Sequence, residues 1–291
     1  MWQASLRKTH KKYLETKYYT QNTFLKVLVY GNIFISIAGL AQVLFTQLVF
    51  KIPFNYYSIS YLIFIFLSTY LQYNMQRGYN LLQQNPQTER ELWLLHHRKP
   101  MLVSLGISLV ALLFLCNWLS WTSIYIMVGA ELVSTLYYMK PFNLRKYGFI
   151  KPLIVAAIWV ISCVVVPLIE NNLLSINAYY FVAAQFFFIT TLCVLFDIKD
   201  AEHDFFTGIK TYANTWGIKG ARLVAFIFLL AYFTCFYFFN PQFSITFFNS
   251  GFLILCSAFI FLTHETRHPY YYYLFVDGLM IAQLMLVLCY L

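Results

Sequence analysis

The feature that most constrains this chain is a recurring apolar run of about 20 residues, the length that a membrane-crossing helix needs. Such runs fill most of the 291-residue sequence, of which 60% is hydrophobic and only 11% is charged. Soluble domains carry about 25% charged residues, so this chain lacks the polar surface that would dissolve it. We therefore expect an all-α polytopic membrane protein with no soluble domain.

Nine such runs can be distinguished along the sequence. The expected architecture is a bundle of nine transmembrane helices around a central cavity that opens toward the cytoplasm. Residues 24–291 would form this single domain, and residues 1–23 would form a cytoplasmic N-terminal tail. The predicted spans are 24–46, 56–73, 101–118, 120–138, 152–169, 178–196, 222–239, 245–263 and 272–290.

The basic residues indicate how the bundle is oriented. All of the Lys and Arg residues except Lys51 fall in or beside the N-terminal tail or the connections on one side. Membrane proteins concentrate such residues in their cytoplasmic connections. We therefore expect the N-terminus inside and the C-terminus outside, in the inner membrane of a bacterium, with the tail in the cytoplasm or against anionic lipid. This distribution accounts for the net charge of +9, which does not predict nucleic-acid binding.

Three of the four aspartates follow the sixth apolar run, at Asp197, Asp200 and Asp204. At about 100° per residue they fall within roughly 60° of one another on a helix, where they repel unless a cation lies between them. Mg²⁺ prefers carboxylate oxygen and shares its shell with phosphate, so a magnesium site at the membrane boundary is one interpretation. A solvated helix end is the other, and Lys199 and His203 in the same stretch favour it.

A basic segment follows the fourth apolar run. Pro141 is expected to end the helix, and Lys140, Arg145 and Lys146 flank it on the side assigned to the aspartates. On its own the segment is typical of an ordinary cytoplasmic connection. Together with the aspartates it indicates a site for a phosphate that a metal bridges.

The chain resembles the UbiA superfamily of intramembrane prenyltransferases over nearly its whole length, and three segments carry the likeness. Residues 197–217 resemble the second aspartate-rich motif of the family and its tail, with Gly208, Thr211 and Gly217 in place. Residues 137–146 resemble its tyrosine-proline-basic segment, and residues 273–279 resemble the start of its last helix. Nine spans with long cytoplasmic loops after the second, fourth, sixth and eighth also match the family.

The resemblance implies the transfer of a prenyl group from an allylic polyprenyl diphosphate to a hydrophobic acceptor, often an aromatic ring. It implies Mg²⁺ held by Asp197, Asp200 and Asp204, and a diphosphate bound by Lys140 and Arg145. Mg²⁺ and basic side chains would stabilise the departing diphosphate, and aromatic faces would stabilise an allylic cation. The lipid bilayer would supply lateral entry for the isoprenoid chain.

The chain departs from the family where the first aspartate-rich motif belongs, at the end of the second span. If Asn74 matches the Asn of that motif, the aspartate positions hold Met75, Gly78 and Leu82. Arg77 could replace a metal by pairing directly with diphosphate oxygens, and Asn74 is a further candidate to bind the diphosphate. Alternatively, Arg77 neutralises an aspartate of the sixth span, and the protein is a non-catalytic or lipid-binding relative of the family.

Residues His264 to His268 spell HExxH, a pattern that places two zinc ligands and a base on one helix. A membrane zinc protease is therefore a formal alternative. Pro269 follows at once, so we expect this stretch at a helix end, and no clear third ligand follows it.

Two ionisable residues lie within predicted spans, where such groups are costly and often functional. Glu131 lies inside the fourth span and Asp277 near the start of the last. Glu131 is either a base on the acceptor side of the cavity or a protonated group bonded to a neighbour. Asp277 is a further candidate to join the site.

Overall fold

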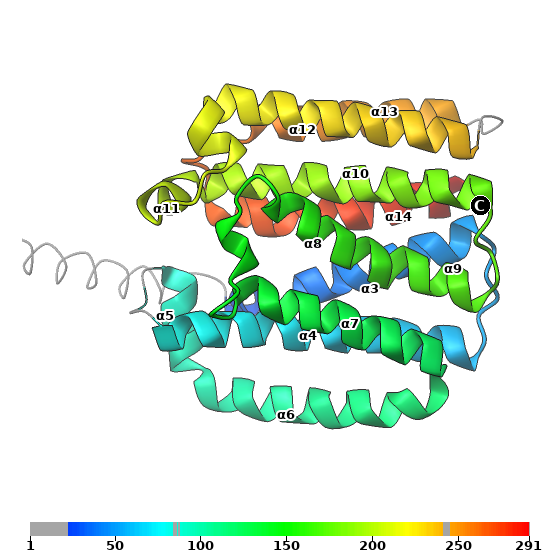
Figure 1. Ribbon diagram of the computed structural model, residues 1–291, viewed down its shortest axis with the longest axis horizontal. Coiled ribbons are helices and arrows are strands. Elements are labelled where there is room, and N and C mark those ends of the chain that lie inside the picture. Colours follow the sequence, from blue (N-terminus) through cyan, green and yellow to red (C-terminus); the bar gives the residue numbers. More distant parts are fainter. Residues whose placement is uncertain (1–22, 84–85, 87, 241–244, 291) are drawn as a thin grey trace, which may run out of the picture.

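A computed structural model describes residues 23–83, 86, 88–240 and 245–290 of the chain. This part is helical and contains no strand, so the predicted all-α class is confirmed (Figure 1). The predicted tail lies outside the described residues, apart from Thr23. The helices are α2 (Thr23–Tyr30), α3 (Ile33–Val49), α4 (Tyr56–Gln83), α5 (Glu89–His96), α6 (Arg98–Leu115), η1 (Cys116–Trp118), α7 (Trp121–Tyr138), η2 (Leu144–Lys146), α8 (Lys151–Val160), η3 (Ile161–Val165), α9 (Val166–Glu170), α10 (Ile176–Lys199), α11 (Ala201–Phe206), α12 (Tyr212–Phe239), α13 (Ile245–Leu262), η4 (Tyr271–Val276) and α14 (Gly278–Tyr290).

The helices make this chain a membrane protein, as its composition predicts. Within the described residues, five helical segments are long and apolar enough to cross a membrane, and the bent pair of α2 and α3 would be a sixth. Each of the nine predicted ranges overlaps a helix or a broken helix. α4 and α7 fall short of the same criteria because they carry more polar side chains, Gln72 and Glu131 among them. The five segments are Arg98–Trp118, Lys151–Glu170, Ile176–Lys199, Tyr212–Phe239 and Tyr271–Cys289.

The first predicted span is broken rather than continuous. α2 and α3 meet at 56°, and Asn32 between them adopts a positive φ of 62°. A side chain of α4 satisfies the polar groups at this break. Asn74 Nδ2 donates to Gly31 O at 3.1 Å, and Asn32 Nδ2 donates to Asn74 Oδ1 at 2.8 Å. The break therefore depends on a residue 42 positions further along the chain.

Two other spans contain a π-helical turn, the kind of irregularity that often occurs at functional sites. In the fifth predicted span the turn is Ile161–Val165, where Tyr61 Oη donates to Ser162 O at 2.7 Å. In the last span the turn is Tyr271–Val276. This second turn contributes Tyr273, and the residue after it, Asp277, to the cavity described below.

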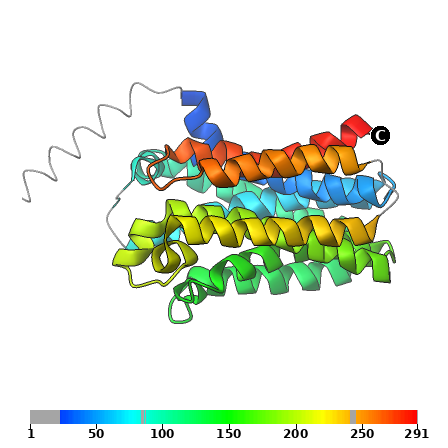
Figure 2. The same cartoon turned by 90° about the horizontal axis from the view of Figure 1, so that it is seen from above.

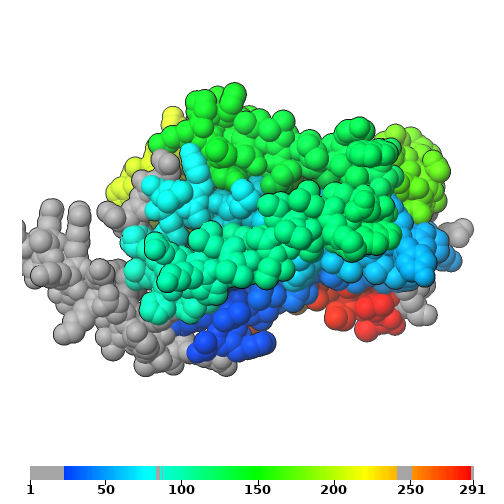
Figure 3. Space-filling view, turned by 90° about the horizontal axis from the view of Figure 1, so that it is seen from below, coloured from blue at the N-terminus to red at the C-terminus, as the bar shows by residue number. Residues whose placement is uncertain are grey.

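α10 and α6 show the extremes of burial in the bundle. In the most apolar window of each segment, 67% of the α10 residues are buried inside the protein, against 11% for the segment that begins with α6. Leu102, Ile107 and Val110 of α6 are 67%, 65% and 68% exposed. Figure 3 shows this segment lying across one face of the molecule. Apolar surface costs about 25 cal/mol per Å² in water, so lipid explains this face better than water does.

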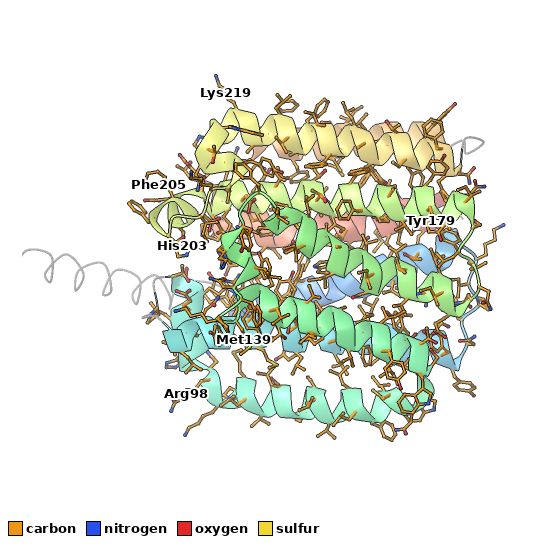
Figure 4. All side chains as sticks on the ribbon, viewed as in Figure 1. Arg98, Met139, Tyr179, His203, Phe205 and Lys219 are labelled. Carbon is orange, nitrogen blue, oxygen red and sulfur yellow. The ribbon has the colours of Figure 1, made fainter. Side chains whose placement is uncertain are left out.

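The helices run lengthwise between two ends of different character (Figure 2). α5 and α11 lie at one end, and Figure 4 places Arg98, His203 and Lys219 there, with Tyr179 toward the other end. Of the described Lys and Arg residues, only Lys51 belongs to a connection at the far end. We call the end with α5 and α11 the basic end. The geometry thus separates the two ends by charge as the sequence predicts, while their orientation in the membrane stays a prediction.

Candidate functional site

A cavity of about 180 Å³, here called the main cavity, lies between the helices at the basic end. Four basic and three acidic side chains line it: Arg77, Arg90, Arg145, Lys151, Asp197, Asp200 and Asp277. An apolar wall completes it, with Phe34, Ile35, Val155, Trp159, Ile189, Leu192 and Met280. An ionic part next to an apolar part suits an amphiphile with an anionic head group.

The three aspartates of the sequence motif do not lie on one helix, because the backbone breaks at Asp200 between α10 and α11. The prediction of one continuous acidic face is therefore wrong. Asp197 and Asp204 are nevertheless brought together by Lys151, whose Nζ lies 2.7 Å from Asp197 Oδ1 and 2.8 Å from Asp204 Oδ2. Both aspartates are almost fully buried, at 1% and 0% exposure. The cation between these two carboxylates is thus an ammonium group of the chain itself.

Asp200 and Arg145 extend this ionic network. Lys199 Nζ lies 2.6 Å from Asp200 Oδ1, and Arg145 Nη2 lies 3.6 Å from Asp204 Oδ1. Burial disfavours the ionised form of Asp200, but Lys199 and Lys151 outweigh it and hold the pKa of Asp200 below its ordinary value. Asp200 is therefore a carboxylate at neutral pH.

Two more arginines reach the main cavity, Arg77 from α4 and Arg90 from α5. Arg90 Nη2 donates to Asn32 Oδ1 at the break between α2 and α3, and its guanidinium lies over the ring of Tyr273, 4.8 Å from the centroid. Burial and the nearby Arg77 lower the pKa of Arg90. Among the described residues, Arg77 takes part in no ion pair. The Nε atoms of Arg77, Arg90 and Arg145 are buried without a hydrogen-bond partner there.

The local sequence explains why α5 holds Arg90 in place. Thr88 caps the helix and forms a capping box with Glu91, in which each side chain bonds the backbone N–H of the other. Trp93 and Leu94 of α5 are buried in a small apolar cluster with residues of α2. α5 is therefore fixed both at its start and along one face.

Of the seven residues predicted for the site, four line the main cavity and three do not. Asp197, Asp200, Arg145 and Arg77 line it. Asp204 does not line the cavity but pairs with Lys151, which does, and Asn74 forms hydrogen bonds at the break between α2 and α3. Lys140 is exposed, and its backbone N–H donates to Tyr79 Oη at 3.2 Å.

The face that α4 turns to the cavity carries no carboxylate. Tyr73, Gln76 and Arg77 line the cavity from α4. The positions aligned with the aspartates of the family point elsewhere, since Met75 is 47% and Leu82 is 84% exposed. α4 therefore contributes a guanidinium and no carboxylate.

Sequence reasoning did not assign Lys151 and Arg90 to the site. Both counted only as basic residues of cytoplasmic connections. One signal for Lys151 was its position directly before Pro152 and the fifth apolar run, where α8 begins. For Arg90, the Thr88 and Glu91 pair marks a capped helix that could be placed against the bundle. Neither signal identifies the partners of these side chains.

A second cavity of about 100 Å³, here called the side chamber, adjoins the main cavity. The two share the wall residues Tyr73, Gln76, Tyr137, Val155 and Trp159. Glu131 is the charged residue of the chamber lining. Polar groups accompany it, since Gln72 Nε2 donates to Ser134 Oγ and Gln72 Oε1 is buried with no described partner. The chamber therefore suits an uncharged molecule that forms hydrogen bonds.

The HExxH sequence does not form the helix that the zinc motif requires. His264 to His268 lie in the connection between Leu262, where α13 ends, and the helical turn at Pro269. His264 Nδ1 lies 3.0 Å from Thr266 Oγ1 within this loop. The two histidines therefore lack helical spacing, and the stretch lies at a helix end as the sequence predicts.

The arrangement of carboxylate oxygens at the three aspartates does not fit Mg²⁺ well. Asp197 Oδ2 has no hydrogen-bond partner among the described residues. However, Lys151 occupies the space between Asp197 and Asp204, and Lys199 pairs with Asp200. No group of three or more His, Cys, Asp or Glu side chains converges in the described part of the chain. Mg²⁺ stays a prediction from the resemblance.

Comparison with known proteins adds no identity to this geometry. No family model, curated protein or solved structure gives a significant match to the chain. The resemblance to the UbiA superfamily therefore depends on the sequence alone, and it stays a prediction.

Proposed function

We propose that this chain is a UbiA-like membrane protein of nine spans that moves a prenyl group from an isoprenoid diphosphate to a hydrophobic acceptor. One observation carries the proposal: four basic side chains and an apolar wall meet in the main cavity. An isoprenoid diphosphate complements both parts, because its head group is anionic and its chain is apolar. The lipid-facing surface of α6 supports a bilayer around the bundle.

The residues of the cavity suit the steps of prenyl transfer. Arg77, Arg90 and Arg145 would stabilise the diphosphate as the carbon–oxygen bond breaks and its electron pair leaves with the diphosphate. The faces of Tyr137 and Trp159, which line both cavities, would stabilise the allylic cation. A carbon of the acceptor then bonds to the prenyl chain, and the acceptor loses a proton.

The side chamber would receive the acceptor in this proposal. It adjoins the main cavity across a shared wall and is lined by Glu131 and polar side chains. Glu131 would take the proton that the acceptor loses. A positioned base of this kind contributes about 10²- to 10⁴-fold to the rate of a reaction.

The proposed topology places the basic end in the cytoplasm of a bacterium and crosses the inner membrane nine times. The separation of the two ends by charge supports it. The N-terminus would then be inside and the C-terminus outside. Single-cysteine labelling from either side of the membrane would test the topology, with residues near Lys51 reactive from outside.

The activity is tested with the full chain in lipid nanodiscs, supplied with farnesyl or geranylgeranyl diphosphate and a panel of phenolic acceptors. Prenylated product and released diphosphate are measured together. Arg77→Ala and Asp200→Ala should each lower the rate at least roughly tenfold. Arg98→Ala, an exposed arginine at the same end, is the matched control. If neither Arg77→Ala nor Asp200→Ala changes the rate, the site assignment is overturned.

A binding protein without catalysis is the second candidate, and the α4 face favours it. Tyr73, Gln76 and Arg77 line the main cavity from this helix, and none is a carboxylate. Such a relative would hold an isoprenoid diphosphate or a similar lipid and release no diphosphate from it. If the chain binds the donor but releases no diphosphate with any acceptor, this second candidate is correct.

A further inference from the structure

The three aspartates of the motif at the basic end are already paired with basic groups of the chain, whereas Asp277 forms no ion pair among the described residues. Lys151 lies within 2.8 Å of carboxylate oxygens of both Asp197 and Asp204. Lys199 lies 2.6 Å from Asp200. A divalent ion shared by these aspartates would have to displace the Lys151 ammonium, which is only 11% exposed at its side chain. A buried ammonium that loses its partners is strongly disfavoured.

The guanidinium groups around the same cavity are matched only in part. Arg145 Nη2 lies 3.6 Å from Asp204 Oδ1 and Arg90 Nη2 donates to Asn32 Oδ1, while Arg77 forms no ion pair among the described residues. The Nε atoms of Arg77, Arg90 and Arg145 are buried and have no hydrogen-bond partner among the described residues. A buried donor without an acceptor costs free energy that a bound acceptor would recover. The three groups come from three separate elements, α4, α5 and η2, and all line the main cavity.

A diphosphate head group would supply the missing acceptors. Guanidinium groups bind phosphate oxygens through parallel, charge-assisted hydrogen bonds. The Lys151 ammonium meanwhile keeps Asp197 and Asp204 from repelling the anion. The basic side chains together would then do what the family assigns to a metal between two acidic motifs.

We infer that this site binds the head group of an isoprenoid diphosphate through Arg77, Arg90 and Arg145 without a divalent metal, with Lys151 as the fixed counter-ion of Asp197 and Asp204. The inference deepens the proposed function and depends on it for the identity of the ligand. The missing first acidic motif is then matched by Arg77 on α4. Asp197 and Asp204 serve to hold Lys151 and Arg145 in place.

The test uses the full chain in nanodiscs of neutral lipid and farnesyl thiodiphosphate, a slowly reacting analogue. Its affinity is measured by calorimetry with EDTA and again with millimolar Mg²⁺. We expect binding with EDTA that is at least as tight as binding with Mg²⁺. Binding that requires Mg²⁺ would overturn the inference and leave the proposed function standing. Failure to bind in both media would overturn the proposed function as well.

Variants locate the binding groups. Arg77→Ala and Arg145→Ala should each weaken binding roughly tenfold or more with EDTA present, and Arg98→Ala should leave it unchanged. Thermal unfolding of each variant shows whether it folds, and the comparison of EDTA with Mg²⁺ on the unaltered chain decides the inference if one does not. Equal loss with Arg98→Ala would overturn the site.

Competition distinguishes a free diphosphate head from a lipid phosphate. Excess inorganic diphosphate should displace the analogue, while anionic phospholipid added to the nanodisc should not. Displacement by the phospholipid alone would assign the site to a membrane lipid and overturn the inference. Neutral farnesol should bind at least roughly tenfold more weakly than the analogue, and equal binding would show that the guanidinium groups play no part.

Discussion

The main cavity and the side chamber share a wall, but the first is lined by many charged side chains and the second mostly by uncharged ones. The main cavity, at the basic end, has seven charged side chains around about 180 Å³. The side chamber, about 100 Å³, lies further from that end and has Glu131 as its charged lining residue. Tyr73, Tyr137 and Trp159 separate the two. The bundle thus keeps its ionic chemistry near one end and its neutral, hydrogen-bonding chemistry deeper inside.

In the proposed reaction, this difference would give the donor and the acceptor separate binding places. An anionic head group is stabilised where basic residues gather, and a neutral acceptor is accommodated where polar but uncharged groups gather. The aromatic wall between them is where the transferred chain would pass. Changes on either side of the wall should therefore have separable effects. Glu131→Gln tests this separation directly, and three other changes test residues around the main cavity.

The largest effect is expected from Lys151→Ala. The change leaves two carboxylates, 1% and 0% exposed, without the ammonium between them. Removing one partner of a buried ionic group typically costs about 3–5 kcal/mol. The free energy of unfolding in detergent should fall by about that amount. The double variant Lys151→Ala with Asp204→Asn should recover part of the loss, and an unchanged unfolding transition would contradict the ionic network.

The second effect is expected from Glu131→Gln and separates the two cavities. Prenyl transfer should fall roughly 100-fold because the acceptor loses its base. Binding of farnesyl thiodiphosphate should not change, since Glu131 does not line the main cavity. A parallel loss of donor binding and of transfer would show that the two cavities act as one site. Gln76→Leu, in the shared wall, serves as the comparison that should affect both.

The third effect is expected from Asn74→Leu. The change removes the hydrogen bonds that join α4 to Gly31 and Asn32 at the break. Buried polar groups left without partners cost about 1–3 kcal/mol, so the free energy of unfolding should fall by that amount. Met75→Leu, an exposed neighbour, is the control. Similar stability of the two variants would show that the break does not need Asn74.

The helices were predictable from the sequence, and their irregularities were not. In a bilayer core the backbone polar groups must form hydrogen bonds within the segment. Each long apolar run is therefore expected to be a helix. The break at Asn32 depends on Asn74, which is distant in sequence. No local sequence pattern predicts that Asn32 and Asn74 form a hydrogen bond. The π turn at Tyr271–Val276 likewise follows from packing.

The acidic half of the site was predictable in composition but not in geometry. Three aspartates beside one apolar run are visible in the sequence, and so is the need for a cation. That the cation is Lys151 follows from how α8 lies against α10. Arg77 was predicted as a substitute for a metal, and it does line the main cavity. Arg90 was missed because its position depends on how α5 packs against α2.

The smallest effect is expected from Lys140→Ala, which tests a residue on which the resemblance and the geometry disagree. The resemblance assigns Lys140 to the diphosphate, whereas its side chain is exposed and lines neither cavity. Its described hydrogen bond uses the backbone N–H, which alanine retains. Stability should change by less than about 0.5 kcal/mol, and donor affinity should stay as it is. A loss as large as that of Arg77→Ala would mean that the segment after α7 folds over the main cavity when the ligand binds.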